Sequence, residues 1–139
     1  MFKALYDRLR GHATPLQHEQ ICIDAWRETL SAKAQLILAS QLSATRLTQR
    51  QAAGAKLCFY YSADGNYPLF ARTEPDLHVA TVILGAGSTA KEMKARVFMH
   101  RGKFFSLEFP KRPARFAQQH QMNLASLYVR SVTTHIDLG

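Results

Sequence analysis

Residues 94–109 have the sequence KARVFMHRGKFFSLEF, in which apolar and polar residues alternate on either side of a central Arg-Gly pair. Such alternation is typical of a β-strand with one buried face, and glycine favours a tight turn between two strands. We therefore predict an antiparallel hairpin whose strands span residues 94–100 and 103–109, with the turn at Arg101 and Gly102.

The charges in the hairpin indicate how its strands pair. When Arg96 lies opposite Glu108, opposite charges face each other and the apolar residues of both strands share one face. That face is then expected to point into the core of the protein. The same pairing sets Val97 and Met99 against Leu107 and Phe105.

Further strands are predicted where β-branched and aromatic residues are frequent. Pro68 gives one of these strands an edge position, because proline cannot donate a ladder hydrogen bond. Pro110 and Pro113 end the sheet after the hairpin, and a short helix is expected at residues 115–120. A continuous apolar run at residues 78–84 favours a central position for the strand predicted there. Outside the hairpin, these strands span residues 57–61, 67–72, 78–84 and 127–136.

The chain before the strands is expected to be helical. Residues 17–53 contain neither Gly nor Pro and are rich in Ala, Leu, Gln and Arg, which favour helices. The apolar stripe loses its phase near Ser31, so we predict two helices, or one bent helix, with a break at residues 29–32. Residues 1–10 carry another amphipathic pattern, and Gly54 ends the helical region.

Helices followed by a run of antiparallel strands are typical of an α+β fold. We expect N-terminal helices packed on one face of a curved, mainly antiparallel sheet of five to six strands. A chain of 139 residues has the usual length of one domain, so residues 1–139 are predicted to form a single domain. Within it, residues 1–54 are expected to be helical and residues 55–139 mostly β.

Composition and charge narrow the classes of function. The chain has 18 Lys and Arg against 10 Asp and Glu, a formal net charge of +8, which favours anionic partners. No apolar run approaches the ~20 residues of a spanning helix, and no signal-peptide pattern is present. We therefore expect a cytoplasmic protein that is not an integral membrane protein. Cys22 and Cys58 are expected to be buried free thiols in preference to a disulfide.

Two short motifs, Pro75-Asp76 and Glu92-Met93-Lys94, resemble the PD-(D/E)xK nuclease signature. In that family, two carboxylates hold Mg²⁺ beside the scissile phosphate, and the lysine helps to position the attacking water. The resemblance implies Mg²⁺-dependent cleavage by Asp76, Glu92 and Lys94. In the simpler interpretation, Asp76 belongs to a turn, and Glu92 and Lys94 enter a solvated strand.

Other catalytic and cofactor motifs are missing from the sequence. His18 and Cys22 lie one helical turn apart, but structural zinc needs four ligands and no second closely spaced pair occurs. The sequence contains no P-loop, no strand-linked GxGxxG, no GxSxG and no HExxH. We therefore expect no cofactor and no metal site, and a binding role is favoured over an enzymatic one.

The basic residues are concentrated in one part of the sequence. Eight Lys and Arg fall within residues 91–115 against two Glu, and aromatic residues are interleaved with them. In a nucleic-acid complex, such cations contact phosphates and such rings stack on bases. A solvated hairpin that avoids edge aggregation is the alternative interpretation. The candidate binding residues are the cations Lys91, Lys94, Arg96, Arg101, Lys103, Lys111, Arg112 and Arg115, and the rings Phe98 and Phe104, which are expected to lie outside the core.

Three functions are consistent with these patterns. The first is a non-enzymatic interaction module, of the adaptor, immunity or chaperone kind, that binds an acidic macromolecular partner, more readily a protein. The alternative is a nucleic-acid-binding protein that uses the basic hairpin at residues 91–115. The third and least favoured is the Mg²⁺-dependent nuclease.

Overall fold

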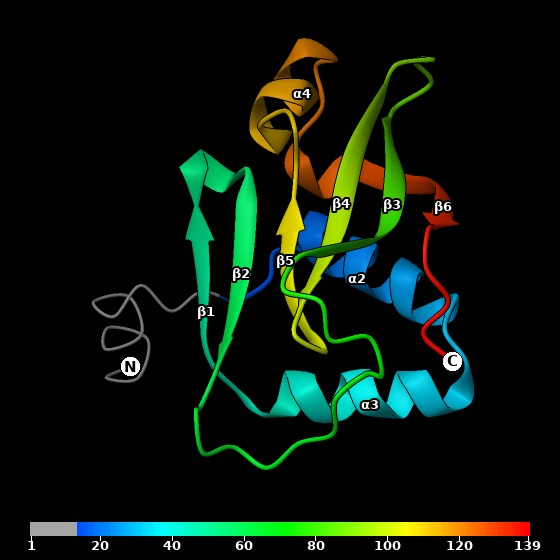
Figure 1. The fold of residues 1–139 in the computed structure, drawn as a ribbon. Helices are drawn as coiled ribbons and strands as arrows, with labels where there is room; N and C mark the ends of the chain where they lie inside the picture. Colours follow the sequence, from blue (N-terminus) through cyan, green and yellow to red (C-terminus); the bar gives the residue numbers. More distant parts are fainter. Residues whose placement is uncertain (1–13) are drawn as a thin grey trace.

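Three α-helices and six β-strands make up residues 14–139, the part of the chain that the structure, a computed structural model, describes (Figure 1). The predicted helix at residues 1–10 lies outside the described residues. Two short 3₁₀ helices, η1 and η2, accompany the main elements. In chain order the elements are α2 (Gln17–Glu28), α3 (Ala32–Ser43), β1 (Thr45–Gln51), η1 (Ala52–Gly54), β2 (Lys56–Tyr61), β3 (Leu77–Ala86), β4 (Glu92–His100), β5 (Lys103–Glu108), α4 (Pro113–Gln119), η2 (Leu124–Ser126) and β6 (Leu127–Thr134).

The six strands form one antiparallel sheet in the order β1-β2-β5-β4-β3-β6. Figure 1 shows α2 crossing behind this curved sheet, α3 running below its lower edge, and α4 at its upper end. The predicted α+β fold, with N-terminal helices and a curved antiparallel sheet, is confirmed. The apolar run at residues 78–84 falls within β3, between β4 and β6, so its predicted central position is also correct.

The predicted break between two helices is confirmed. α2 ends at Glu28 and α3 begins at Ala32, and the side-chain oxygen of Ser31 accepts a hydrogen bond of 3.1 Å from the backbone amide of Ala34. A serine cap of this kind satisfies an amide that has no partner inside the helix. At the start of α2, the carboxylate of Glu19 accepts a hydrogen bond of 2.7 Å from the amide of Leu16.

The prediction of a helix as far as residue 53 is wrong. Residues 45–51 form the edge strand β1, which pairs with β2 over its whole length. Gln and Arg favour helices, but tertiary context readily overrides this propensity, and here the antiparallel pairing with β2, which has one irregularity between Thr45 and Leu47, outweighs it. The helical part of the chain therefore ends at Ser43, about ten residues earlier than expected.

The strand predicted at residues 67–72 does not form. The segment is an irregular connection between β2 and β3, although Phe70 within it is buried. The amide of Phe70 donates to the carbonyl of Gly102 at 2.9 Å, and the side chain of Gln41 donates to the carbonyls of Pro68 and Gly102 at 3.0 and 2.9 Å. A contact to α3 and to the β4–β5 turn thus holds this segment where the sequence suggested an edge strand.

The β4–β5 hairpin follows the predicted register at the end that leads into α4. Arg96 lies opposite Glu108 and Val97 lies opposite Leu107, with the turn at Arg101 and Gly102. Arg101 has φ 51° and Gly102 has φ 81°, the positive values that two-residue hairpin turns require.

The two cysteines are free thiols, as the sequence predicted. Cys22 and Cys58 are both free and both buried. Burial raises the pKa of the Cys22 thiol to about 12, and its Sγ donates to the carbonyl of His18 at 3.2 Å. Among the helices of residues 14–139, none is long and apolar enough to cross a membrane.

Candidate anion-binding surface

The sheet has one face covered by helix and one face that no described helix covers. In β4, Met93, Ala95, Val97 and Met99 are buried, and the residues between them are exposed or half-buried. Figure 1 places α2 on one side of the sheet, and α3 and α4 at its ends. We call the other side the outward face. On β4 it presents Glu92, Lys94, Arg96, Phe98 and His100.

Three adjoining hollows form one groove around Pro110, at the upper end of the outward face. The first, of about 230 Å³, is lined by Lys56, Arg96 and Phe98 among others. The second, of about 220 Å³, shares Arg96 and Pro110 with the first. The third, of about 420 Å³, shares Pro110 and Lys111 with the second and continues along the start of α4. We call these three hollows together the Pro110 groove.

Cations dominate the lining of the Pro110 groove. Six Lys and Arg line it, against the carboxylates of Glu92 and Glu108. Lys56 lies 3.9 Å from Glu108, and Glu92 lies 3.6 Å from Arg130 on β6. The remaining five cations are exposed, and within residues 14–139 none of them has a carboxylate oxygen within 4.0 Å. They are Lys94, Arg96, Lys111, Arg112 and Arg115.

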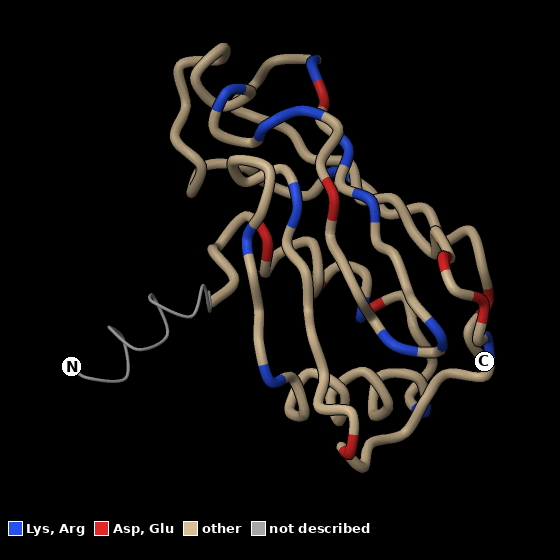
Figure 2. The backbone as a smooth tube through the Cα atoms, turned by 60° about the vertical axis from the view of Figure 1, so that its left-hand side comes forward, with Lys and Arg blue, Asp and Glu red and all other residues tan. Residues whose placement is uncertain are grey.

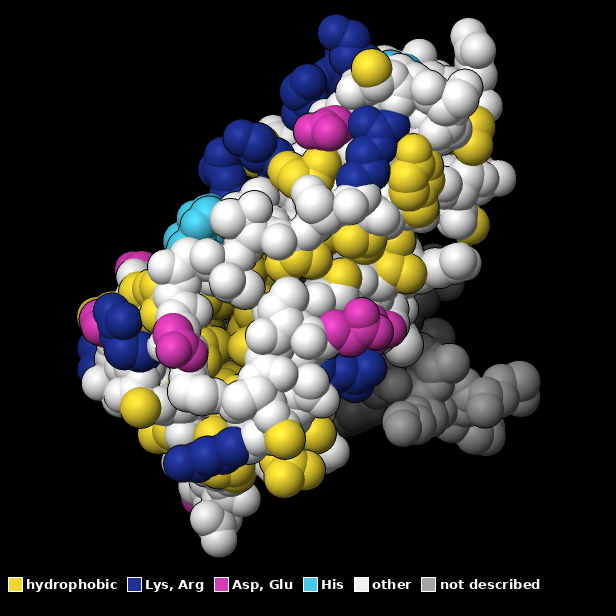
Figure 3. Space-filling model, turned by 90° about the vertical axis from the view of Figure 1, so that its right-hand side faces the viewer, with side chains coloured by type: hydrophobic (Ala, Val, Ile, Leu, Met, Phe, Trp, Pro, Cys, Tyr) yellow, Lys and Arg dark blue, Asp and Glu magenta, His cyan; other side chains and the backbone are white. Residues whose placement is uncertain are grey.

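The groove lies at the end of the molecule where positive charge gathers. In Figure 2, Lys and Arg positions cluster around the upper end, next to α4. Figure 3, which views the molecule from its right-hand side, shows Lys and Arg side chains gathered toward the upper left. Cations outnumber the carboxylates of Glu92 and Glu108 in the lining, and the repulsion among the excess cations is relieved when an anion binds among them.

Five rings from four strands lie on the outward face beside the groove. Phe98 stacks on His78, with ring centroids 5.0 Å apart and 23° between the planes, and Phe98 also lines the first hollow. Phe105 meets Tyr60 edge-on at 5.8 Å and His100 at 5.7 Å. All five rings are half-buried. We call them the ring platform.

Through the hydroxyl of Thr81, His78 joins the ring platform to His135, which directly follows β6. The Oγ1 of Thr81 lies 3.0 Å from the Nε2 of His78 and 2.8 Å from the Nε2 of His135. Burial and, to a smaller extent, the neighbouring His135 and Arg96 lower the pKa of His78. The imidazole that stacks on Phe98 is therefore harder to protonate than a histidine in water.

The structure brings six of the ten predicted binding residues together in the Pro110 groove: Lys94, Arg96, Lys111, Arg112, Arg115 and Phe98. Arg101 and Lys103 lie at the other end of the hairpin, roughly 13 Å from Arg96 along the strand. There the Nζ of Lys103 lies 5.9 Å from the ring centroid of Tyr61. Lys91 is exposed in the β3–β4 loop and does not line the groove.

The prediction that Phe104 lies outside the core is wrong. The β4–β5 ladder slips just before Met99, so that Met99 lies opposite Phe104 and not opposite Phe105. Phe104 is fully buried, 5.2 Å from Trp26 and 4.6 Å from Phe59 between ring centroids. Phe105 takes the outward position instead. A β-bulge adds one residue to one strand, and alternation alone does not locate it.

Sequence analysis missed five residues of this surface: Lys56, Tyr60, His78, His100 and Phe105. In the strand predicted at residues 57–61, alternation sets the apolar Leu57 and Phe59 on one face, and thus Tyr60 and the adjoining Lys56 on the other. The signal for these two was therefore present. For Phe105 the sequence carried no such signal, because its position depends on the bulge.

The residues that resemble the nuclease signature do not come together. Asp76 precedes β3, whereas Glu92 begins β4 and pairs with Gly85 near the far end of β3. Nine residues of strand separate Asp76 from Gly85, which corresponds to roughly 25–30 Å. Lys94 is on the outward face near Glu92, but no group of three or more His, Cys, Asp or Glu that could hold a metal ion is found among residues 14–139.

Arg130 holds the β3–β4 loop at the edge of the groove. Its guanidinium donates to the carbonyls of Thr89 and Ala90, and lies 3.6 Å from Glu92. Gly85 makes room for it, because a Cβ at that position would come within 2.3 Å of Arg130 Nε. Within the described residues, the ion pair of Glu92 is therefore with Arg130, and none of the five groove cations lies within 4.0 Å of its carboxylate.

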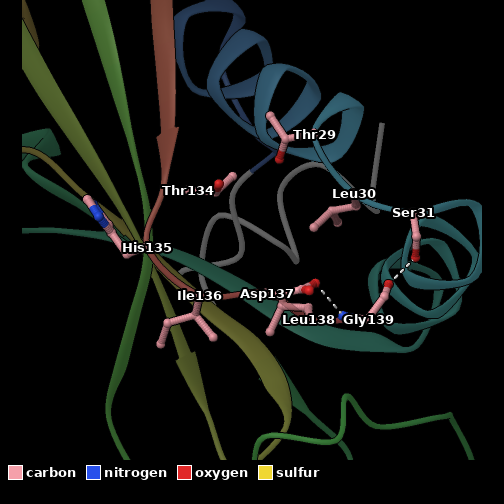
Figure 4. A pocket seen from close by; sticks show the side chains of 9 residues that line it. All are labelled: Thr29, Leu30, Ser31, Thr134, His135, Ile136, Asp137, Leu138 and Gly139. Carbon is pink, nitrogen blue, oxygen red and sulfur yellow. Dashed lines mark hydrogen bonds between the residues drawn. The ribbon is translucent and has the colours of Figure 1, made fainter.

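A separate hollow of about 260 Å³ lies between the α2–α3 turn and residues 134–139. Figure 4 shows the side chain of His135 turned away from it, toward the sheet. Ser31 donates to the carbonyl of Gly139, and Asp137 accepts from the amide of Gly139 at 2.9 Å (Figure 4). None of the predicted binding residues lines this hollow, and its one acidic side chain is engaged with the backbone.

The chain matches no protein-family model, no curated protein and no solved structure. Its function is therefore argued from its own geometry.

Proposed function

We propose that this protein is a non-enzymatic nucleic-acid-binding protein whose Pro110 groove contacts the phosphate backbone. The observation that carries the proposal is the set of five exposed cations that line the three hollows around Pro110, none with a carboxylate oxygen within 4.0 Å among the described residues. Binding of phosphates to a surface of this kind is favourable, because condensed counterions are released from the nucleic acid.

The type of cation in the groove supports phosphate as the ligand. Arg96, Arg112 and Arg115 each offer a planar guanidinium that can donate two hydrogen bonds to one phosphate. Lys94 and Lys111 act as point charges beside them. The five arise from β4, from the segment after β5 and from α4, so they form an extended track, which suits a polymer of phosphates better than one small anion.

An acidic protein partner, which the sequence favoured, would also be attracted by these five cations. What favours nucleic acid is the neighbouring ring platform: Phe98 lines the same hollow as Arg96. A ring beside a phosphate-binding cation matches the composition of a nucleotide, which has a charged backbone next to a flat base. Acidic side chains offer no such flat partner.

The proposal is tested by fluorescence anisotropy with labelled 20-nucleotide DNA and RNA. The double variant Arg96→Gln with Lys111→Gln removes two groove cations. The matched control, Lys33→Gln with Arg46→Gln, removes the same charge from exposed positions on α3 and β1. We expect binding at about 50 mM salt that is weakened about tenfold or more in the groove variant and by less than about threefold in the control.

Two results would overturn the proposal. One is the absence of binding to any oligonucleotide at low salt. The other is equal weakening in the groove variant and in the control, which would mean that net charge and not the groove attracts the nucleic acid.

A further inference from the structure

From the ring platform we infer that the preferred ligand is single-stranded nucleic acid, with unpaired bases stacking on Phe98 and Phe105. This inference rests on the proposed function, since it assigns the bases of a strand whose phosphates lie in the Pro110 groove. It concerns rings on the side of the sheet that no described helix covers (Figure 1).

Phe98 lies beside a cation of the groove, so a base that stacks on it can belong to the nucleotide whose phosphate that cation binds. It follows Arg96 by two residues in β4, so both side chains point to the outward face about 7 Å apart. Both also line the first hollow. His78 stacks against the Phe98 ring and fixes its orientation, so little side-chain freedom is lost when a base stacks on it.

Phe105 extends the platform away from the groove. Its ring meets Tyr60 edge-on at 5.8 Å and His100 at 5.7 Å, and the Nζ of Lys56 lies 5.9 Å from its centroid. Lys56 also lines the first hollow. A cation therefore lies next to each of the two phenylalanine rings, Arg96 beside Phe98 and Lys56 beside Phe105. This repeated pairing fits successive nucleotides of one strand.

The preference for a single strand over a duplex follows from which parts of the nucleic acid the rings of the platform can contact. In a duplex, the faces of the bases are covered by neighbouring base pairs, and an aromatic ring on a broad sheet contacts only the sugar–phosphate backbone. In a single strand, the bases are free to turn and stack on protein rings, and this stacking tolerates any base because every base has a flat face. Cations alone would not distinguish the two, whereas the ring platform does.

The inference is tested with a labelled 20-nucleotide single strand of mixed sequence and the duplex of the same sequence, at equal salt. We expect the single strand to bind at least about fivefold more tightly per molecule, although the duplex carries twice the phosphates. Poly-glutamate of similar length serves as the probe for an acidic protein. It should compete at least tenfold more weakly than the single strand.

Ring variants separate stacking from charge. Phe98→Leu and Phe105→Leu keep an apolar side chain but remove the ring, and each should weaken single-strand binding about fivefold or more while leaving duplex binding unchanged. Tyr67→Leu is the matched control, because its half-buried ring contacts Tyr61 in the β2–β3 connection and lies outside the platform. Circular dichroism and thermal melting verify that each variant is folded.

Failure of this inference is distinguishable from failure of the proposed function. If duplex and single strand bind equally and the ring variants bind like the unaltered protein, the groove still binds nucleic acid but the single-strand inference is wrong. If no oligonucleotide binds, both are wrong. If poly-glutamate competes as well as the single strand, the surface recognises acidic polymers in general, and the assignment to nucleic acid is overturned.

Discussion

Gln41 shows how one side chain fixes the lower end of the sheet. Its amide is fully buried on α3 and makes three hydrogen bonds: it donates to the carbonyls of Pro68 and Gly102 at 3.0 and 2.9 Å, and it accepts from the amide of Phe104 at 3.0 Å. The carbonyl of Gly102 also accepts a hydrogen bond from the amide of Phe70, so Gln41 joins α3 to both the β2–β3 connection and the β4–β5 turn. A buried polar group without a partner costs about 1–3 kcal/mol.

Replacing Gln41 with Met is therefore expected to cause a large loss of stability. The new side chain has a similar length but no amide, so we expect the free energy of unfolding to fall by about 2–4 kcal/mol. Gln35→Met on the same helix is the control, because Gln35 is half-buried and its side chain donates one hydrogen bond, to Leu30. Urea denaturation measures both variants. A Gln41 variant no less stable than the control would contradict the account.

His18 gives the protein a defined dependence on pH. It is buried on α2, with its ring 5.7 Å from that of Phe109, and burial is the main cause that lowers its pKa. The unfolded chain thus binds a proton at a higher pH than the folded one does. The stability contributed by neutral His18 is complete above about pH 6.5 and is lost as pH falls from there toward its folded pKa.

The predicted loss of stability at low pH is checked by measuring the free energy of unfolding at pH 7.5 and at pH 5.0. The unaltered protein should lose more stability between these values than the His18→Gln variant does. Because the lowered pKa of His78 acts in both proteins, the difference between them isolates His18. An identical pH dependence in the two proteins would contradict the interpretation.

At the scale of elements, a buried ion pair joins α2 to β1. Glu19 is fully buried, and its carboxylate accepts two hydrogen bonds from the guanidinium of Arg50, at 2.9 and 2.6 Å. Removal of one partner from a buried pair leaves a charge without compensation, whereas removal of both is often far less harmful. The side chain of Arg50 is one quarter exposed, which reduces but does not remove this asymmetry.

Arg50→Met is therefore expected to lower the free energy of unfolding by about 2–3 kcal/mol, and adding Glu19→Met should restore part of the loss. Arg27→Met breaks the exposed pair with Asp24 and should cost less than about 0.5 kcal/mol. Thermal or urea denaturation of the four proteins tests this. A double variant less stable than Arg50→Met alone would contradict the assignment of the pair.

The elements that were predicted correctly are those whose sequence pattern lies within the element itself. Alternation and charge placed the β4–β5 hairpin and its pairing of Arg96 with Glu108, and the loss of apolar phase near Ser31 placed the break before α3. The failures have non-local causes. Residues 45–51 became a strand because β2 pairs with them, and residues 67–72 were held as a connection by Gln41 and Gly102.

The candidate site was predictable to a similar extent. Five of its cations were visible as a surplus between residues 91 and 115, because charge is read directly from the sequence. Which of these cations meet was not visible, since that depends on the return of the chain past Pro110 to the start of α4. The exchange of Phe104 for Phe105 arose from a one-residue slip in the ladder, which alternation does not reveal.

At the scale of the whole molecule, the helices cover one side of the sheet and leave charge and rings on the other. The inward side holds the packed core, which includes Trp26, Phe59 and Phe104. The outward face joins the ring platform to the Pro110 groove through Phe98. The inward side stabilises the fold, and we propose that the outward face binds a nucleic-acid strand.

The salt dependence of binding tests that claim most directly. Five phosphate contacts on a single strand predict a slope of about −3.5 for the logarithm of the association constant against the logarithm of salt concentration, from ~0.7 per contact. Arg96→Gln with Lys111→Gln should reduce the slope to about −2, and the Lys33→Gln, Arg46→Gln control should leave it unchanged. A slope near zero in the unaltered protein, or the same slope in the groove variant and the control, would contradict the account.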